Sequence, residues 1–235
     1  MRTVPRAAEG WCGERRLLGF ALVFVTSDTI LATSAPSLPA TAVPMAAARR
    51  LREATRARHD AVERLPLMQA LMHGRLDTEG YAALLRRHLA VFAAWEHRHA
   101  AWLSALAPVW RYRPRTSALQ ADLAALQVPL AACNPALSND LRASDEAACW
   151  GMLYVAEGSL LGGRVIARRL RTHQPDLAIA LRYFELGGDE PAAWPRFQRL
   201  LQNALPDPGA LARATAGAGA LFDFFHHHLD DRKAA

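Results

Sequence analysis

The segment from Tyr154 to Gly163, Tyr-Val-Ala-Glu-Gly-Ser-Leu-Leu-Gly-Gly, places three glycines inside what the sequence pattern predicts to be one long helix. A glycine in a helix interior costs roughly 1 kcal/mol relative to alanine. Gly158 and Gly162 are four residues apart and therefore share one face of the helix. This spacing indicates a backbone that comes close to something flat or bulky. The alternatives are a close helix–helix crossing and a kink.

A histidine about a hundred residues upstream lies in a second helical segment, which runs from Leu51 to Glu63. His59 and Glu63 are i and i+4 neighbours, so the carboxylate can reach the imidazole. A metal-bound histidine usually donates its other N–H to a carboxylate, a carbonyl or water. The alternative is an ordinary surface pair. Together with the glycine face, the histidine points to a planar cofactor held between the two helices.

The elements that position these residues are predicted to be helices throughout. The chain has 235 residues, of which 51% are hydrophobic and 21% charged. Alanine and leucine dominate and β-branched runs are few, which favours helices over strands. We predict a single all-α domain over residues 45–235. Its expected helices lie at about 46–65, 77–106, 116–127 and 144–172, with Asp77 as the N-cap of the second. A short helix is expected before Gly187. Two more helices are expected to have Pro191 and Pro208 in their first turns, and the last of them ends near Leu229.

Residues 1–44 differ from the rest of the chain and are not predicted to belong to the domain. The apolar run from Leu17 to Val25 is too short to span a bilayer. A stretch rich in Ser, Thr, Ala and Pro follows it, up to Pro44. Three explanations stay open: translation that truly begins at Met45, a disordered extension, or a targeting segment.

The charge pattern bears on possible partners. The net charge is +6 and the pI about 9.9. The basic residues are scattered among acidic ones, without a basic arm that carries aromatics, so we expect no nucleic-acid partner. An acidic small molecule or protein fits better. No membrane association is expected. The three cysteines lack metal-ligand spacing, which favours a reducing, cytoplasmic compartment.

Two motifs resemble those of bacterial haem oxygenases, most closely the branch found beside bacterial phytochromes. Leu-Arg-x-x-Thr-x-x-x-His-x-x-x-Glu at 51–63 looks like the proximal helix of that family, and Tyr-Val-x-Glu-Gly-Ser-x-Leu-Gly-Gly at 154–163 looks like its distal helix. The resemblance spans about residues 51–229. It implies a helical bundle that holds haem between the proximal helix and a kinked, glycine-rich distal helix.

The resemblance also implies roles for individual residues near the iron. His59 would be the axial iron ligand, and Glu63 would orient it. Gly158 and Gly162 would line the distal face of the haem. Ser159 would sit where related enzymes place a polar residue that organises distal water, a position held by Asp in the mammalian relatives.

Further roles concern the edge of the ring. The resemblance places Arg52 at a basic position that meets a haem propionate. Tyr154 is expected to contribute to the distal pocket. The propionate partners of the late helices do not align cleanly with this sequence, and Arg196 and Arg199 are the candidates.

The activity that the resemblance implies is the oxidative opening of haem b to biliverdin, carbon monoxide and iron. Haem would serve as both substrate and cofactor, with O2 as co-substrate and electrons from a separate reductase or ferredoxin. Biliverdin would pass to a bacterial phytochrome, or the reaction would serve iron release. Two alternatives are a haem-binding protein without turnover, for storage, sensing or trafficking, and a helical scaffold without a cofactor.

Other histidines give weaker signals. Glu96-x-x-His99 is half of a ferritin-like di-iron motif without a second half, and we interpret it as a solvated face. His226, His227 and His228 lie where a helix end favours positive charge. No partner is predicted for His88 or His73.

Overall fold

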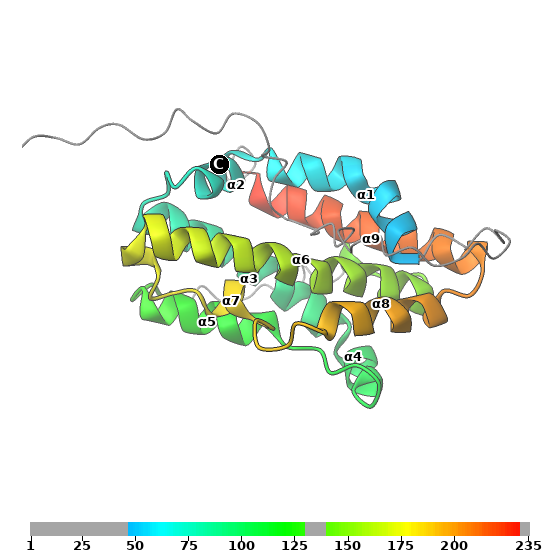
Figure 1. Ribbon diagram of the computed structural model, residues 1–235. Helices are drawn as coiled ribbons and strands as arrows, with labels where there is room; N and C mark the ends of the chain where they lie inside the picture. Colours follow the sequence, from blue (N-terminus) through cyan, green and yellow to red (C-terminus); the bar gives the residue numbers. More distant parts are fainter. Residues whose placement is uncertain (1–46, 130–139, 231–235) are drawn as a thin grey trace, which may run out of the picture.

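The computed structural model describes residues 47–129 and 140–230, and all regular elements within these ranges are helical (Figure 1). The all-α prediction is therefore confirmed. The predicted extension at 1–44 lies outside the described residues. The elements are α1 (Ala47–Glu63), α2 (Pro66–Met72), α3 (Thr78–Arg98), α4 (Ala100–Leu106), α5 (Arg115–Ala125), α6 (Glu146–His173), η2 (Pro175–Leu177), α7 (Arg182–Glu185), α8 (Ala193–Ala204) and α9 (Pro208–Leu229).

Side-chain caps fix the starts of the long helices. Asp77 accepts a hydrogen bond from the backbone N–H of Gly80, as its predicted N-cap role requires, and Asp207 does the same for α9 ahead of Pro208. Asp145 caps α6, which therefore begins two residues after its predicted start at 144. These carboxylates satisfy N–H groups that have no partner inside the helix. From its cap, α6 runs unbroken for 28 residues despite its glycines.

Three predictions about residues 77–191 are wrong. The helix predicted over 77–106 is divided at His99 into α3 and α4. The His99 side chain is buried: its Nε2 lies 3.0 Å from the Leu141 carbonyl oxygen and its Nδ1 lies 3.7 Å from Cys149 Sγ. The Glu96–His99 pair is therefore not a solvated face, because tertiary partners from two later segments hold the histidine inside. Pro191 also precedes α8 instead of lying in its first turn.

Helix α6 runs through the middle of the bundle, with α9 packed along it and α1 packed along α9 (Figure 1). Two glycines allow α6 and α9 to approach closely. A Cβ atom at Gly151 would overlap the backbone of Ala214, and one at Gly217 would overlap the backbone of Ala148. The interpretation of a small-residue helix crossing thus holds for Gly151, a position that the sequence did not single out.

The short helix α7 is held in place by a carboxylate from another helix. Asp122 of α5 is fully buried and accepts the backbone N–H groups of Arg182 and Tyr183, each at 2.9 Å. Burial raises the pKa of Asp122, against the effect of these hydrogen bonds. On the other side, a Cβ atom at Gly163 would come within 2.7 Å of the Phe184 carbonyl oxygen. Glycine therefore lets α7 lie directly against α6.

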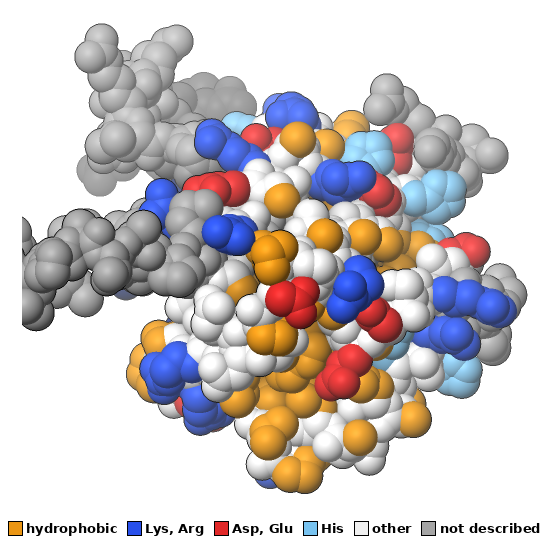
Figure 2. Space-filling model, turned by 90° about the vertical axis from the view of Figure 1, so that its right-hand side faces the viewer, with side chains coloured by type: hydrophobic (Ala, Val, Ile, Leu, Met, Phe, Trp, Pro, Cys, Tyr) orange, Lys and Arg blue, Asp and Glu red, His pale blue; other side chains and the backbone are white. Residues whose placement is uncertain are grey.

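Charged side chains of both signs are mixed on the surface. On the face shown in Figure 2, basic and acidic groups lie next to one another rather than forming a continuous basic area. Ion pairs such as Arg58–Asp223 (3.0 Å) and Arg171–Glu185 (2.6 Å) are typical. Among the described helices, none has the length and hydrophobicity needed to cross a membrane.

Candidate functional site

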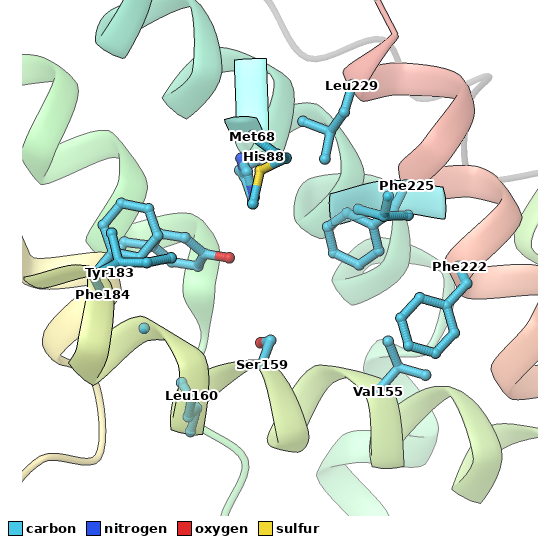
Figure 3. Close-up of a pocket in the computed structure, with 13 residues that line it drawn as sticks. Met68, His88, Val155, Ser159, Leu160, Tyr183, Phe184, Phe222, Phe225 and Leu229 are labelled. Carbon is cyan, nitrogen blue, oxygen red and sulfur yellow. The ribbon is translucent and has the colours of Figure 1, made fainter. Parts of the chain in front are cut away.

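A cavity lies between α1, α6 and α9, closed at its far end by α2, α3 and α7 (Figure 3). The empty space among its lining atoms, together with the open solvent at its mouth, is about 550 Å³. Its walls are almost entirely apolar: Val62, Met68, Val155, Leu160, Gly163, Ile166, Phe184, Phe222, Phe225 and Leu229. The polar lining residues are Ser159, His88 and Tyr183. Figure 3 shows the Ser159 and Tyr183 hydroxyls and the His88 ring directed into the same space.

Ser159 offers lone pairs to the cavity and no proton. Its hydroxyl donates to the Ala156 carbonyl oxygen at 2.8 Å, one turn back along α6. A serine hydroxyl carries a single proton, so the remaining capacity of Oγ is to accept. A water molecule bound here would therefore donate to Ser159. This geometry fits the predicted role of Ser159 in organising water.

His59 lies on α1 beside the cavity, with 14% of its side chain exposed. Its Nε2 is 3.7 Å from Glu63 Oε1, and its Nδ1 is 3.4 Å from Asp60 Oδ1. The ring meets Phe222, which lines the cavity, edge-on with centroids 6.0 Å apart. The predicted His59–Glu63 approach is thus present, and the structure adds Asp60. Ligand atoms of the three side chains lie within 4.8 Å of one another.

Arg52 of α1 acts electrostatically on Tyr154 of α6. Tyr154 is buried, and its ring centroid is 5.9 Å from that of Trp194. Burial raises the pKa of the Tyr154 hydroxyl, and the nearby positive charge of Arg52 opposes that rise. Arg52 itself is exposed. An exposed arginine on the helix that bears His59 suits an anionic group at the surface edge of a site.

Arg196 is engaged elsewhere in this structure. Its guanidinium lies 2.5 Å from Glu190 and stacks over the Trp110 ring at 5.0 Å from the centroid. Arg199 is exposed on the same helix, α8. Neither arginine lines the cavity, so their predicted propionate roles stay predictions.

The glycines of the distal motif differ in what they contact. Gly158 and Gly162 are buried within α6, next to the lining residues Ser159 and Gly163. Gly163 forms part of the cavity wall and also packs against α7. The distal-face roles of Gly158 and Gly162 stay predictions.

Comparison with known proteins identifies the family. Residues 45–231 match the family model described as Heme oxygenase. The chain belongs to the haem oxygenase family. A curated relative named Heme oxygenase, from Xanthomonas campestris pv. campestris (strain 8004), is 50% identical over 161 residues, which cover 68% of this chain and 94% of the relative.

Solved haem oxygenase structures share the fold of this chain. One is the NO- and CO-bound haem oxygenase from Neisseria meningitidis, with a TM-score of 0.57 and 22% identity over 79% of this chain and 90% of that one. Another is haem oxygenase-1 from the cyanobacterium Synechocystis sp. PCC6803 in complex with haem, with a TM-score of 0.58 and 19% identity over 78% of this chain and 90% of that one. At these identities the likeness establishes the all-α haem oxygenase fold.

Sequence reasoning missed His88, which this haem oxygenase fold places in the cavity wall. The Nδ1 of His88 lies 3.0 Å from the Leu84 carbonyl oxygen, so Nδ1 carries the proton and Nε2 is an acceptor. Burial lowers the pKa of His88 to about 4, and the ring is therefore neutral at pH 7. The available signal was its place among Leu84, Leu85 and Leu89, which marks a histidine on the core face of a helix.

Tyr183 is the other polar lining residue, and it belongs to the segment Arg182-Tyr-Phe-x-x-Gly187, which resembles the family more loosely and to which the sequence gave no role in the site. Its ring centroid lies 5.4 Å from that of His88. Burial raises the pKa of its hydroxyl, which therefore stays protonated and can donate. Asp122 and the packing of α7 against Gly163 hold Tyr183 at the cavity, and neither contact is visible in the local sequence.

Proposed function

We propose that this chain is a haem oxygenase that opens haem oxidatively to biliverdin, carbon monoxide and iron, with O2 and externally supplied electrons. The observation that carries the proposal is the apolar cavity between α1, which bears His59, and α6, which bears Ser159 and the glycines, in a chain of the haem oxygenase family. The proposed electron donor is a separate ferredoxin or flavoprotein reductase.

The residues around the cavity fit haem. Apolar and aromatic walls suit the faces of a porphyrin, and a neutral imidazole is a common haem-iron ligand. His59 would hold the iron, and Glu63 or Asp60 would accept the N–H of the other ring nitrogen, which fixes the tautomer. Bound haem supplies both the iron that activates O2 and the ring that is oxidised.

On the side of the cavity opposite His59, the chain supplies neutral side chains that can form hydrogen bonds. Ser159 and His88 can each accept a hydrogen bond from a bound molecule, and Tyr183 can donate one. These groups can bind and orient water without placing a fixed charge beside the ring. The surrounding phenylalanines exclude further solvent, which strengthens each remaining hydrogen bond.

We infer that Arg52 holds a propionate at the margin of the site and that Tyr154 contributes to the distal pocket. The exposure of Arg52 on α1, the helix that bears His59, supports its role, since an arginine fork binds a carboxylate through two parallel hydrogen bonds. Arg196 would have to exchange Glu190 for a propionate in order to take part.

The proposal extends to two partners. The net charge of +6 favours association with an acidic electron donor, because opposite charges steer the encounter. The resemblance to the phytochrome-associated branch suggests a bacterial phytochrome as the acceptor of biliverdin. The second partner is tested by mixing the reaction with a purified bacterial apophytochrome and measuring how much biliverdin it takes up.

An absorption time course tests the activity. The full chain with one equivalent of haem is supplied with a ferredoxin system in air. The Soret band should disappear while a broad biliverdin band grows, with the extracted product confirmed by mass. A haem complex that persists under a working electron supply would show a haem carrier instead, and failure to form any saturable complex would refute a haem site.

The ligand assignment has a matched control. His59→Ala should weaken haem binding and abolish turnover while the fold persists. His73→Ala changes an exposed histidine on the turn after α2 and should behave like the unaltered chain. Undiminished binding and turnover in His59→Ala would rule out His59 as the iron ligand.

A further inference from the structure

A buried ion pair lies behind α6, on the side away from the cavity. Arg115, the first residue of α5, is 0% exposed, and Glu157 of α6 is 6% exposed. Arg115 Nη2 donates to Glu157 Oε1 at 3.1 Å. Glu157 is two residues from both Val155 and Ser159, a rotation of about 200° around the helix, which places it opposite these cavity-lining residues.

The guanidinium group of Arg115 also holds backbone. Nη1 donates to the Arg113 carbonyl oxygen at 2.5 Å, and Nη2 donates to the Ala156 carbonyl oxygen at 3.1 Å. The group lies over the Tyr112 ring at 4.3 Å from the centroid. Arg115 therefore connects the start of α5 to the middle of α6 by charge-assisted hydrogen bonds, which are stronger than neutral ones.

A second carboxylate ties this connection to α3. Glu96 Oε1 accepts the backbone N–H of Arg115 at 2.6 Å and the Tyr112 hydroxyl at 2.8 Å. Taking charged groups out of water is unfavourable unless their geometry and hydrogen bonds are well satisfied. The α6 segment at Ala156 and Glu157 therefore has a defined position relative to Glu96 of α3 and Arg115 of α5.

The same α6 segment carries the hydroxyl of the cavity. The Ala156 carbonyl oxygen accepts hydrogen bonds both from Arg115, on the far side, and from Ser159 Oγ. Gly158 follows Glu157 directly and has no side chain with which to fix its own position. The contacts of Arg115 are therefore a restraint on the position of this part of the backbone, beside the packing of α9 and α7 against α6.

We propose that the Arg115–Glu157 pair sets the position of α6 over the haem, so that Arg115 is a positioning residue for Ser159 and the glycine backbone. This inference rests on the proposed function and deepens it. Releasing the tie would let the segment from Ala156 to Ser159 shift relative to the ring. Contacts with a small ligand on the iron, and the choice of the ring carbon that is attacked, would then change.

The test replaces the pair by apolar side chains in the variant R115M/E157L. Such replacements are often neutral or stabilising, whereas a single substitution would leave one buried charge without its partner. R115K keeps the charge but loses the planar fork. The control is R171A. It removes an exposed arginine of α6, the helix that carries Glu157, and this arginine pairs with Glu185.

Haem affinity, the carbonyl stretching band of the ferrous CO complex and the ratio of biliverdin isomers are measured for each variant. R115M/E157L should bind haem with nearly unchanged affinity, while its CO band shifts or splits, its isomer ratio changes by about twofold or more, and its turnover falls roughly tenfold. R115K should lie between this variant and the unaltered chain, and R171A should match the unaltered chain.

The outcomes separate the two proposals. An unaltered chain that binds no haem would overturn the proposed function, and this inference with it. If the unaltered chain forms biliverdin, but R115M/E157L keeps its CO band and isomer ratio, the positioning role is wrong. Should the double variant not fold, the same two measurements on R115K decide, and an R115K variant indistinguishable from the unaltered chain would overturn the role.

Discussion

Protonation of His88 should destabilise the folded chain as the pH falls below neutral. An unfolded histidine has a pKa near 6.5, and burial lowers the pKa of His88 to about 4. Between these two values the unfolded chain binds a proton that the folded chain rejects. Stability is therefore fully present above pH 6.5 and is lost as the pH falls toward 4.

The size of the effect follows from the interval between the two pKa values. Each pH unit between them corresponds to about 1.4 kcal/mol of free energy of unfolding. The full loss from His88 is then on the order of 3 kcal/mol, and the loss between pH 7 and pH 5 is about 2 kcal/mol. For a domain of ordinary stability this is a large fraction of the total.

The assay is urea unfolding of the haem-free chain at pH 7 and at pH 5, followed by circular dichroism. Burial also lowers the pKa values of His99 and His228, so the unaltered chain should lose more than His88 alone explains. His88→Gln removes one titrating group and should reduce the pH-dependent loss by about 2 kcal/mol. Met68→Leu alters the same cavity without a titrating group and should retain the full loss.

The quantity to compare between variants is the change in free energy of unfolding between pH 7 and pH 5, because each variant also changes stability at pH 7. A His88→Gln chain that loses as much free energy of unfolding between pH 7 and pH 5 as the unaltered chain would refute the claim. In that case His88 would already be protonated in the folded state, or its ring would be open to water.

Other changes have outcomes that the packing determines. Gly151→Ala would force a methyl group against the backbone of Ala214. We expect it to lower the free energy of unfolding, measured by urea titration, by roughly 1–3 kcal/mol or more. An unchanged unfolding midpoint would mean that α6 and α9 separate easily. Asp122→Ala leaves two buried N–H groups at the start of α7 without an acceptor. It should lower the free energy of unfolding by on the order of 2–3 kcal/mol and weaken haem binding by displacing Tyr183. A haem affinity equal to that of the unaltered chain would show that α7 keeps its position without the Asp122 cap. Arg58→Ala breaks an exposed pair with Asp223 and should change the unfolding midpoint hardly at all, so a large loss there would contradict the view that this pair is solvated.

Local rules account for what the sequence predicted well. Asp77 and Asp207 were predictable as helix starts because a cap needs only a side-chain oxygen and the next few backbone N–H groups. The His59–Glu63 approach was predictable because residues four apart share a helix face. The family motifs are also local, each lying within a single helix.

The same rules failed where distant segments competed with local preference. The periodic pattern continued through His99, but burial of its ring against Leu141 and Cys149 divides the helix there. Gly151 was overlooked because a single glycine in a helix carries no sign of what lies opposite. Only the packing of α9 shows that the space for a side chain is taken.

The sequence by itself therefore determined the helical class, most helix starts and the two motif-bearing helices, since each depends on the backbone period and on neighbours within one turn. The tertiary structure decided the site. Six helices supply the walls of the cavity, and Asp122 and Arg115 act on residues some 60 and 40 positions away. Such contacts depend on how the helices pack against one another, because burial and hydrogen bonding between distant segments leave no periodic trace in the chain.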